Sequence, residues 1–300
     1  MNSDASAAIT PAPLPRWTRY IALGDSVTEG LWDPYPQAEV AGAAQEDGEA
    51  AAASSKYIRQ RGWADRLATA LSARRISCGE PALEYANLAV RGRKLPQIVA
   101  EQVPAALTSA PDLVSILGGG NDILRPGVDV EDIAGLLEEA VVQVRATGAD
   151  VLLGTGFKSG RALRWTRSAT GQFNAEVWGI AQRHGCHVLD LWGMTSLFDL
   201  RLWADDRIHP TPDGHERIKD AALVALGLAP DNPAYDVPLG PDEDARWDRI
   251  KGDASWARSH GLPWIGRRMA GKSSGDRIRP KWATPVVWEP GLGEPDTPPV

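Results

Sequence analysis

The chain contains 300 residues, of which 43% are hydrophobic and 24% are charged, and its formal net charge is −7. This length and composition predict a soluble, globular protein of one or at most two domains. The acidic balance argues against a nucleic-acid partner, because neutralising phosphates requires clustered Lys and Arg. The first 19 residues contain neither a basic start nor an unbroken apolar run, and no later window approaches 18 consecutive apolar residues. We therefore expect a cytoplasmic protein without stable membrane insertion.

An N-terminal tail, residues 1–18, precedes the first predicted strand. Tyr20–Leu23 is an apolar run too short for a helix, and it leads directly into Gly24, Asp25 and Ser26. Soon afterwards, residues 37–56 are rich in Ala and in acidic side chains and offer little that would form a core face. We interpret this segment as a surface insertion, with a lid over a functional site as the alternative.

Strands and helices then alternate along the chain. The further apolar runs that predict strands are Glu84–Val90, Leu113–Leu117, Asp150–Gly154 and His187–Leu191. Helical periodicity is found at about Trp63–Arg74, Leu95–Leu107, Ile133–Val144 behind the N-cap Asp129, Ser168–His184 and Thr211–Leu226. This alternation predicts an α/β fold with a mostly parallel sheet, in which ligands bind beyond the carboxyl ends of the strands. Ser26 lies at such an end.

The composition changes after about Pro230, towards Pro, Gly and five tryptophans. A short helix is expected around Asp242–His260, followed by a Pro-punctuated segment with little periodicity. We interpret residues 229–300 as an extension whose tryptophans anchor it to the main domain. The alternative is that the extension contacts a partner or a membrane surface, because six basic residues between positions 267 and 281 make it locally basic.

The segment DDRIHP offers a base for Ser26. A serine hydroxyl is a poor nucleophile unless a base accepts its proton. Asp206 precedes His209 by three residues, a separation that lets the two side chains share one face of a turn. We therefore predict Ser26 as the nucleophile, His209 as the general base and Asp206 as the carboxylate that orients His209, with Asp205 as the rival for the last role.

Three groups are candidates for holding an oxyanion. In the segment ILGGGND, the third strand runs into three glycines and then presents Asn121, whose side-chain amide is a suitable donor. Gly92 follows the second strand, and its missing side chain would let its backbone N–H approach a substrate. The N–H of Ser26 is the third donor. We interpret Asp122 as a structural residue that bonds to loop backbone, and plain turn geometry is the alternative for Gly92.

Taken together, GDSVTEG, the Gly92 turn, GGND and DRIHP resemble the SGNH hydrolases, also called the GDSL esterase and lipase family. The four letters of the name correspond to Ser26, Gly92, Asn121 and His209, in the family's chain order. The resemblance covers residues 19–228. It implies a flavodoxin-like three-layer α/β/α sandwich with a five-stranded parallel sheet. It also implies a serine hydrolase acting on ester bonds, whose substrates in the family include acyl lipids, acetylated sugars and thioesters.

We expect a small-molecule ester as the substrate, and no metal or organic cofactor. Trp32 and Tyr35 follow the nucleophile closely, and aromatic side chains suit a short acyl group or a sugar ring. No segment that would build a long apolar groove is evident. A short-chain esterase is therefore our prediction, with a long-chain lipase or a thioesterase as the alternative.

Three other patterns have competing interpretations. GRRMAGKS, residues 266–273, matches the phosphate-loop pattern, but Pro263 and Pro280 interrupt the strand and the helix that such a loop needs. The overlapping GKSSG matches the nucleophile elbow and meets the same objection. The segment HGCH places His184 and His187 close in sequence, but one ends a predicted helix and the other begins a strand. The alternative functions are a nucleotide-binding protein and a noncatalytic binding module.

Overall fold

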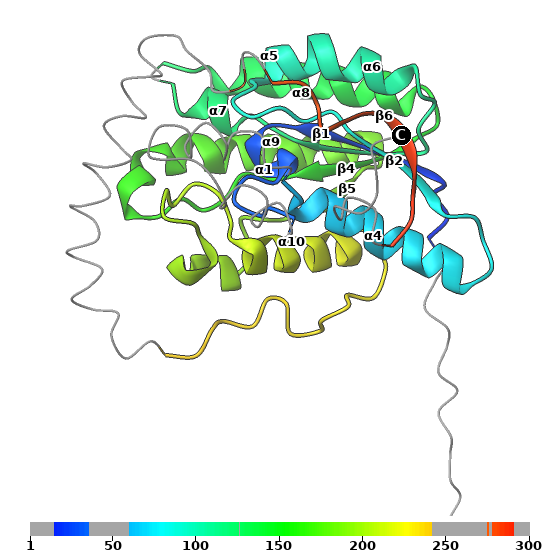
Figure 1. Cartoon of the computed structure of the whole chain (residues 1–300). Helices are drawn as coiled ribbons and strands as arrows, with labels where there is room; N and C mark the ends of the chain where they lie inside the picture. Colours follow the sequence, from blue (N-terminus) through cyan, green and yellow to red (C-terminus); the bar gives the residue numbers. More distant parts are fainter. Residues whose placement is uncertain (1–14, 36–59, 126, 242–274, 276–277, 291–300) are drawn as a thin grey trace, which may run out of the picture.

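The computed structural model describes residues 15–35, 60–125, 127–241, 275 and 278–290. Six strands form one sheet in the order β5-β4-β3-β1-β2-β6 (Figure 1). Five of them pair in parallel, namely β1 (Arg19–Gly24), β2 (Leu83–Asn87), β3 (Leu113–Leu117), β4 (Asp150–Gly154) and β5 (His187–Leu189). The sixth strand, β6 (Trp282–Trp288), is antiparallel to β2.

Helices cover both faces of this sheet (Figure 1). One face carries α4 (Gly62–Ser77) and α10 (Pro212–Ala225). The other face carries α8 (Val130–Arg145), α9 (Arg167–His184) and a helical segment made of α5 (Leu95–Gln97), the π-helical turn η1 (Ile98–Gln102) and α6 (Val103–Leu107). The predicted α/β sandwich is confirmed.

Alternation along the central strand explains why there are two cores. Tyr20 and Ala22 of β1 point into a cluster with α4 and α10, whereas Ile21 and Leu23 join a cluster with α8 and α9. All four side chains are fully buried. A strand that is apolar on both faces fits only a sheet covered on both sides, which fixes β1 at the centre of the sandwich.

The sheet differs from the prediction in its sixth strand. Five strands were expected, and the residues after His260 were expected to form a Pro-punctuated segment with little periodicity. β6 contains Pro285 and is an edge strand, where a missing N–H is tolerated. Trp288 pairs with Leu83 and Trp282 with Asn87, so β6 begins at the carboxyl end of β2.

The expected helix at Asp242–His260 and the insertion at 37–56 lie outside the described residues. No helix in the described part of the chain is both long and apolar enough to cross a membrane. The division into a tail (1–18), a hydrolase domain (19–228) and an extension (229–300) stands as a proposal, with the qualification that β6 of the extension completes the sheet of the domain.

Candidate active site

Ser26 begins the single-turn helix α1 (Ser26–Glu29) immediately after β1. The turn between them passes through Gly24, whose φ is 155° and where a Cβ would lie 2.5 Å from the carbonyl oxygen of Leu117. Only glycine fits there. The Asp25 side chain caps the helix by accepting a hydrogen bond from the Val27 N–H at 3.2 Å. The strand end and the cap together place the Ser26 hydroxyl at the carboxyl edge of the sheet.

His209 and Asp206 meet Ser26 at this edge. His209 Nε2 lies 2.8 Å from Ser26 Oγ, and His209 Nδ1 lies 2.6 Å from Asp206 Oδ2. Because an ionised carboxylate only accepts, Nδ1 carries the proton and Nε2 is left to accept from the serine hydroxyl. Asp205 is exposed, and Asp206 occupies the position beside the imidazole. The structure therefore brings the three predicted residues into one hydrogen-bonded chain.

The charge on Asp206 is held by its surroundings. Burial alone would raise the pKa of Asp206, but hydrogen bonds from His209 and from the backbone N–H groups of Ile208 and His209 outweigh burial and lower this pKa to about 2. An ionised Asp206 fixes the tautomer of His209 and stabilises the imidazolium that forms when the ring takes a proton.

Trp32 also binds Asp206, which the sequence analysis did not anticipate. The Trp32 indole N–H donates to Asp206 Oδ2 at 2.8 Å, the same oxygen that accepts from His209. Tyr35 is only 4% exposed, and its hydroxyl donates to Asp65 rather than facing the serine. Neither aromatic ring lines the cavity beside Ser26. The prediction that both would form an aromatic substrate wall is therefore not supported by the geometry.

Asn121 lies in α7 (Gly120–Ile123), just beyond the carboxyl end of β3, the strand that pairs with β1. Gly119 turns the chain there with a φ of 93°, and a Cβ on it would lie 2.8 Å from the Phe173 ring. The Asn121 amide donates to Asp25 Oδ2 at 2.9 Å and to the carbonyl oxygen of Arg93 at 3.0 Å. The amide is thus oriented next to Ser26, but it must share or exchange one of these acceptors to bind an oxyanion.

Gly92 lies in the turn after β2, with a φ of 76° that favours glycine. The preceding residue, Arg91, ties this turn to α1, because its backbone N–H donates to the Glu29 carboxylate at 2.6 Å and its guanidinium forms an ion pair with the same group. Gly92 does not line the cavity beside Ser26. Its role as an oxyanion donor stays a prediction.

Asp122 has the structural environment that was predicted for it. Its carboxylate accepts a hydrogen bond from the Leu95 N–H at 3.0 Å, at the start of the helical segment over the sheet. Burial raises the pKa of Asp122, and the bond from Leu95 opposes this shift.

A cavity of about 950 Å³ opens beside Ser26. Its wall is mostly apolar, and much of it comes from two short segments, Phe157–Thr166 and η3–η4 (Ser196–Phe198 and Leu200–Leu202). These segments are irregular or 3₁₀-helical, so neither produces the periodic pattern by which helices and strands are found in a sequence. The expectation that no segment builds an apolar groove is therefore wrong.

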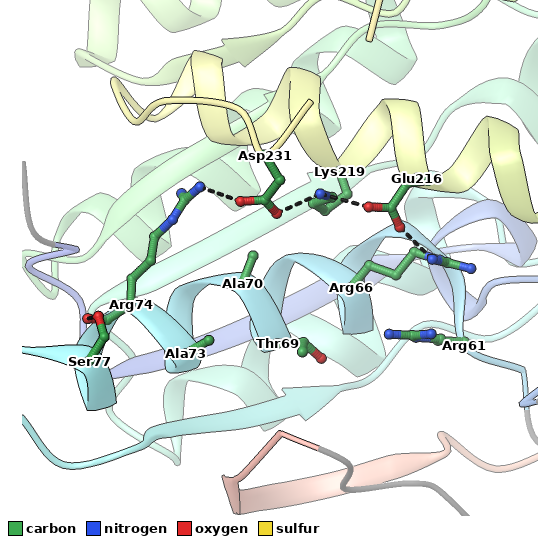
Figure 2. Close-up of a pocket in the computed structure, with 10 residues that line it drawn as sticks. All are labelled: Arg61, Arg66, Thr69, Ala70, Ala73, Arg74, Ser77, Glu216, Lys219 and Asp231. Atoms are coloured by element: carbon green, nitrogen blue, oxygen red, sulfur yellow. Dashed lines mark hydrogen bonds and ion pairs between the residues drawn. The ribbon is translucent and has the colours of Figure 1, made fainter. Parts of the chain in front are cut away.

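A second hollow, of about 350 Å³, lies between α4 and α10 (Figure 2). Basic and acidic side chains alternate along it: Glu216 pairs with Arg66 and Lys219, and Asp231 pairs with Lys219 and Arg74. Arg66, Arg74 and Lys219 are therefore each paired with a carboxylate of the same groove, and Arg61 also lines it. The ion pair between Arg66 and Glu216 links α4 to α10 across this hollow. The hollow is distinct from the cavity beside Ser26.

The two histidines of HGCH have different partners, and the phosphate-loop and elbow patterns fall almost entirely outside the described residues. His184 binds the Glu138 carboxylate, whereas His187 Nδ1 bonds to the carbonyl oxygen of Ala225. Within the residues that the structure describes, no three His, Cys, Asp or Glu side chains form a group suited to a metal ion. GRRMAGKS and GKSSG, at residues 266–275, lie in a part that is described only at Gly275.

The sequence and the geometry agree with a match to a known family. Residues 22–217 match the model of the GDSL-like lipase/acylhydrolase family, which is more than half of the chain. The chain belongs to this family. It is therefore a serine ester hydrolase, and Ser26, Asn121 and His209 all lie within the matched residues. No similar sequence is found among curated proteins.

Solved structures with the same fold as this chain include esterases. A variant of the acetyl xylan esterase Axe2 from Geobacillus stearothermophilus is 19% identical, covering 72% of this chain and 97% of its own, with a TM-score of 0.56. LAE5, an α/β hydrolase from the metagenome of Lake Arreo, is 24% identical, with coverages of 70% and 95% and a TM-score of 0.55. The esterase EstA from Pseudoalteromonas sp. is 16% identical, with coverages of 70% and 97% and a TM-score of 0.51. At these identities the likeness shows the fold alone.

Replacing Asn121 with alanine is expected to lower kcat for ester hydrolysis by about a hundredfold, the usual effect of removing one oxyanion donor. The measurement is steady-state kinetics on a p-nitrophenyl ester. Asp122→Asn is the control, because its amide oxygen still accepts from Leu95, and it should keep kcat within about twofold. An effect of Asn121→Ala on KM alone would remove Asn121 from the oxyanion hole.

Proposed function

We propose that this protein hydrolyses a carboxylic ester through a covalent acyl-enzyme on Ser26. The observation that carries the proposal is the hydrogen-bonded chain from Asp206 through His209 to Ser26, with distances of 2.6 Å and 2.8 Å, at the wall of a large cavity. This arrangement supplies a nucleophile, a base and an orienting carboxylate in one place.

Each residue has a defined part in the two half-reactions. His209 Nε2 takes the proton of the Ser26 hydroxyl as Oγ attacks the ester carbonyl, and the imidazolium then gives that proton to the departing alcohol. Water repeats the cycle with His209 as base, which releases the acid and restores Ser26. The Ser26 N–H is one of the first N–H groups of α1, which have no acceptor inside the helix, and it is the oxyanion donor best placed by the chain.

The apolar cavity supports a substrate with a larger hydrophobic group than acetyl. Phe157, Phe198, Leu200 and Trp203 all contribute to its wall. Burying a methylene group contributes about 0.8 kcal/mol, so each added carbon that enters the cavity should improve binding in the transition state. This proposal replaces the expectation of a short acyl group, which rested on the apparent lack of such a wall.

We expect kcat/KM on p-nitrophenyl esters to rise at least about tenfold from acetyl to an acyl chain of roughly six to eight carbons. The test is a series of esters with increasing chain length. Phe198→Ala should flatten the series, because Phe198 lines the cavity and is 51% exposed, so the folded core is spared. Trp178→Ala is the matched control, since Trp178 is 50% exposed and lies outside the cavity. A maximum at acetyl would restore the short-acyl interpretation.

A further inference from the structure

Lys281 is a buried lysine that immediately precedes β6, and its ammonium lies at the carboxyl end of α1. Its side chain is 9% exposed. The ammonium donates to the carbonyl oxygens of Glu29 at 2.7 Å, Gln60 at 2.8 Å and Arg61 at 2.7 Å, and it forms an ion pair with Asp65 at 2.9 Å. Glu29 is the last residue of the helix that Ser26 begins. This lysine therefore connects the end of that helix to the start of α4.

The two helices meet at this point without room for side chains. A Cβ on Gly30 would lie 2.5 Å from the backbone nitrogen of Gly62, and a Cβ on Gly62 would lie 2.3 Å from the Cα of Gly30. The carbonyls of Glu29 and Arg61, which Lys281 binds, immediately precede Gly30 and Gly62 on the two segments that cross. The Lys281 ammonium thus bridges the two backbone segments where Gly30 and Gly62 are in contact.

Asp65, the carboxylate partner of Lys281, is fully buried and organises further contacts with α1. It accepts hydrogen bonds from Tyr85 at 2.8 Å and from Asn87 at 3.2 Å. The same Asn87 amide donates to the carbonyl oxygen of Thr28 at 2.9 Å. The carbonyls of Thr28 and Glu29, at the end of α1, are therefore bound by side chains that Asp65 holds in place.

The same segment of the extension also contacts the Gly92 turn. At Gly275, a Cβ would lie 2.0 Å from the carbonyl oxygen of Arg91, so the two backbones are in direct contact. Arg91 in turn binds the Glu29 carboxylate. Gly275 and Lys281 of the extension thus reach the turn that carries Gly92 and the end of the nucleophile helix, respectively.

We propose that Lys281 is a positioning residue for Ser26, acting through the end of α1. A helix of four residues has too few internal hydrogen bonds to hold its own position, so its orientation is set by what binds its ends. Lys281 lies outside residues 22–217, the part that matches the family. The inference rests on the proposed function of Ser26, and it adds that the extension takes part in aligning the nucleophile.

The test compares Lys281→Met with the parent enzyme in steady-state ester hydrolysis. We expect kcat to fall by about ten- to a hundredfold with KM changed less than about threefold, because a displacement of about 1 Å at the nucleophile slows the reaction without removing the substrate cavity. Titration with a fluorophosphonate should still label Ser26 in all molecules, but at a lower second-order rate. An unchanged kcat would overturn the proposal.

A stability control separates positioning from general weakening. Trp288→Leu removes a side chain that is 1% exposed at the opposite end of β6, where its indole N–H binds Thr69. It should lower Tm and leave kcat within about twofold; a loss of kcat as large as that of Lys281→Met would overturn the proposal. If Lys281→Met does not fold, the double variant Asp65→Asn, Lys281→Met removes the unpaired buried charge, and its kcat must still be reduced.

The outcome also distinguishes this proposal from the proposed function. A parent enzyme that neither hydrolyses any ester nor reacts with the fluorophosphonate at Ser26 would reject both. An active parent enzyme whose Lys281→Met variant keeps the parent kcat would reject the positioning role alone.

Discussion

Replacing Ser26 or His209 with alanine is expected to lower kcat for ester hydrolysis by about a thousandfold or more, and the double variant should lose little further. Ser26 Oγ and His209 Nε2 are 2.8 Å apart and act as one unit, so removing either ends the same proton transfer. The measurement is kcat for the three variants on one p-nitrophenyl ester. Near-full activity of Ser26→Ala would reject the mechanism.

Folding of these variants is checked by Tm. Ser26 is half-buried and His209 is 13% exposed on its side chain, so neither belongs to the two apolar cores. Their alanine variants should therefore unfold within a few degrees of the parent protein.

Asp206→Asn is expected to lower kcat by about ten-thousandfold. The asparagine amide would donate to His209 Nδ1, which moves the ring proton to Nε2 and leaves no lone pair for the Ser26 hydroxyl. Asp205→Asn is the matched control, because Asp205 is the exposed neighbour and has no bond to the imidazole in the described structure. Equal losses in the two variants would contradict the assignment of Asp206.

The same substitution has a consequence for stability at low pH. The folded-state pKa of Asp206 is lowered to about 2, below its value of about 3.9 in an unfolded chain. Its contribution to stability is therefore fully present above about pH 4 and is lost as pH falls through about 2. Part of the acid destabilisation of the parent protein should be missing in Asp206→Asn, as measured by urea unfolding between these pH values.

Much of the site follows from the sequence because parallel strands end at one edge of a sheet. Ser26 ends β1 and Asn121 follows β3, which pairs with β1, so two short motifs far apart in the chain become neighbours. Asp206 and His209 are three residues apart in one turn, so their proximity can be predicted without knowledge of the fold. Glycine at positions 24 and 119 gave a further signal, because only glycine fits both turns.

Other features depend on contacts that no local pattern encodes. The bond from Trp32 to Asp206 joins residues 174 positions apart, and Trp32 has a positive φ of 68°, which is rare for a bulky side chain. The apolar cavity is built by irregular segments. Strand β6 contains a proline, and it is recognised as a strand only when its partner β2 is known to lack a neighbour on that side.

The pairing of β6 with β2 also sets an order of events when the protein is made. Lys281 binds the carbonyl of Gln60, 221 residues earlier, so this contact can form only after the whole intervening chain and Lys281 itself have left the ribosome. Until then, the edge of β2 is uncovered and the Asp65 carboxylate has no ammonium partner. A nascent chain stopped before residue 275 would therefore expose the unpaired backbone groups of the β2 edge to other chains. Chaperone binding should persist until β6 has paired with β2.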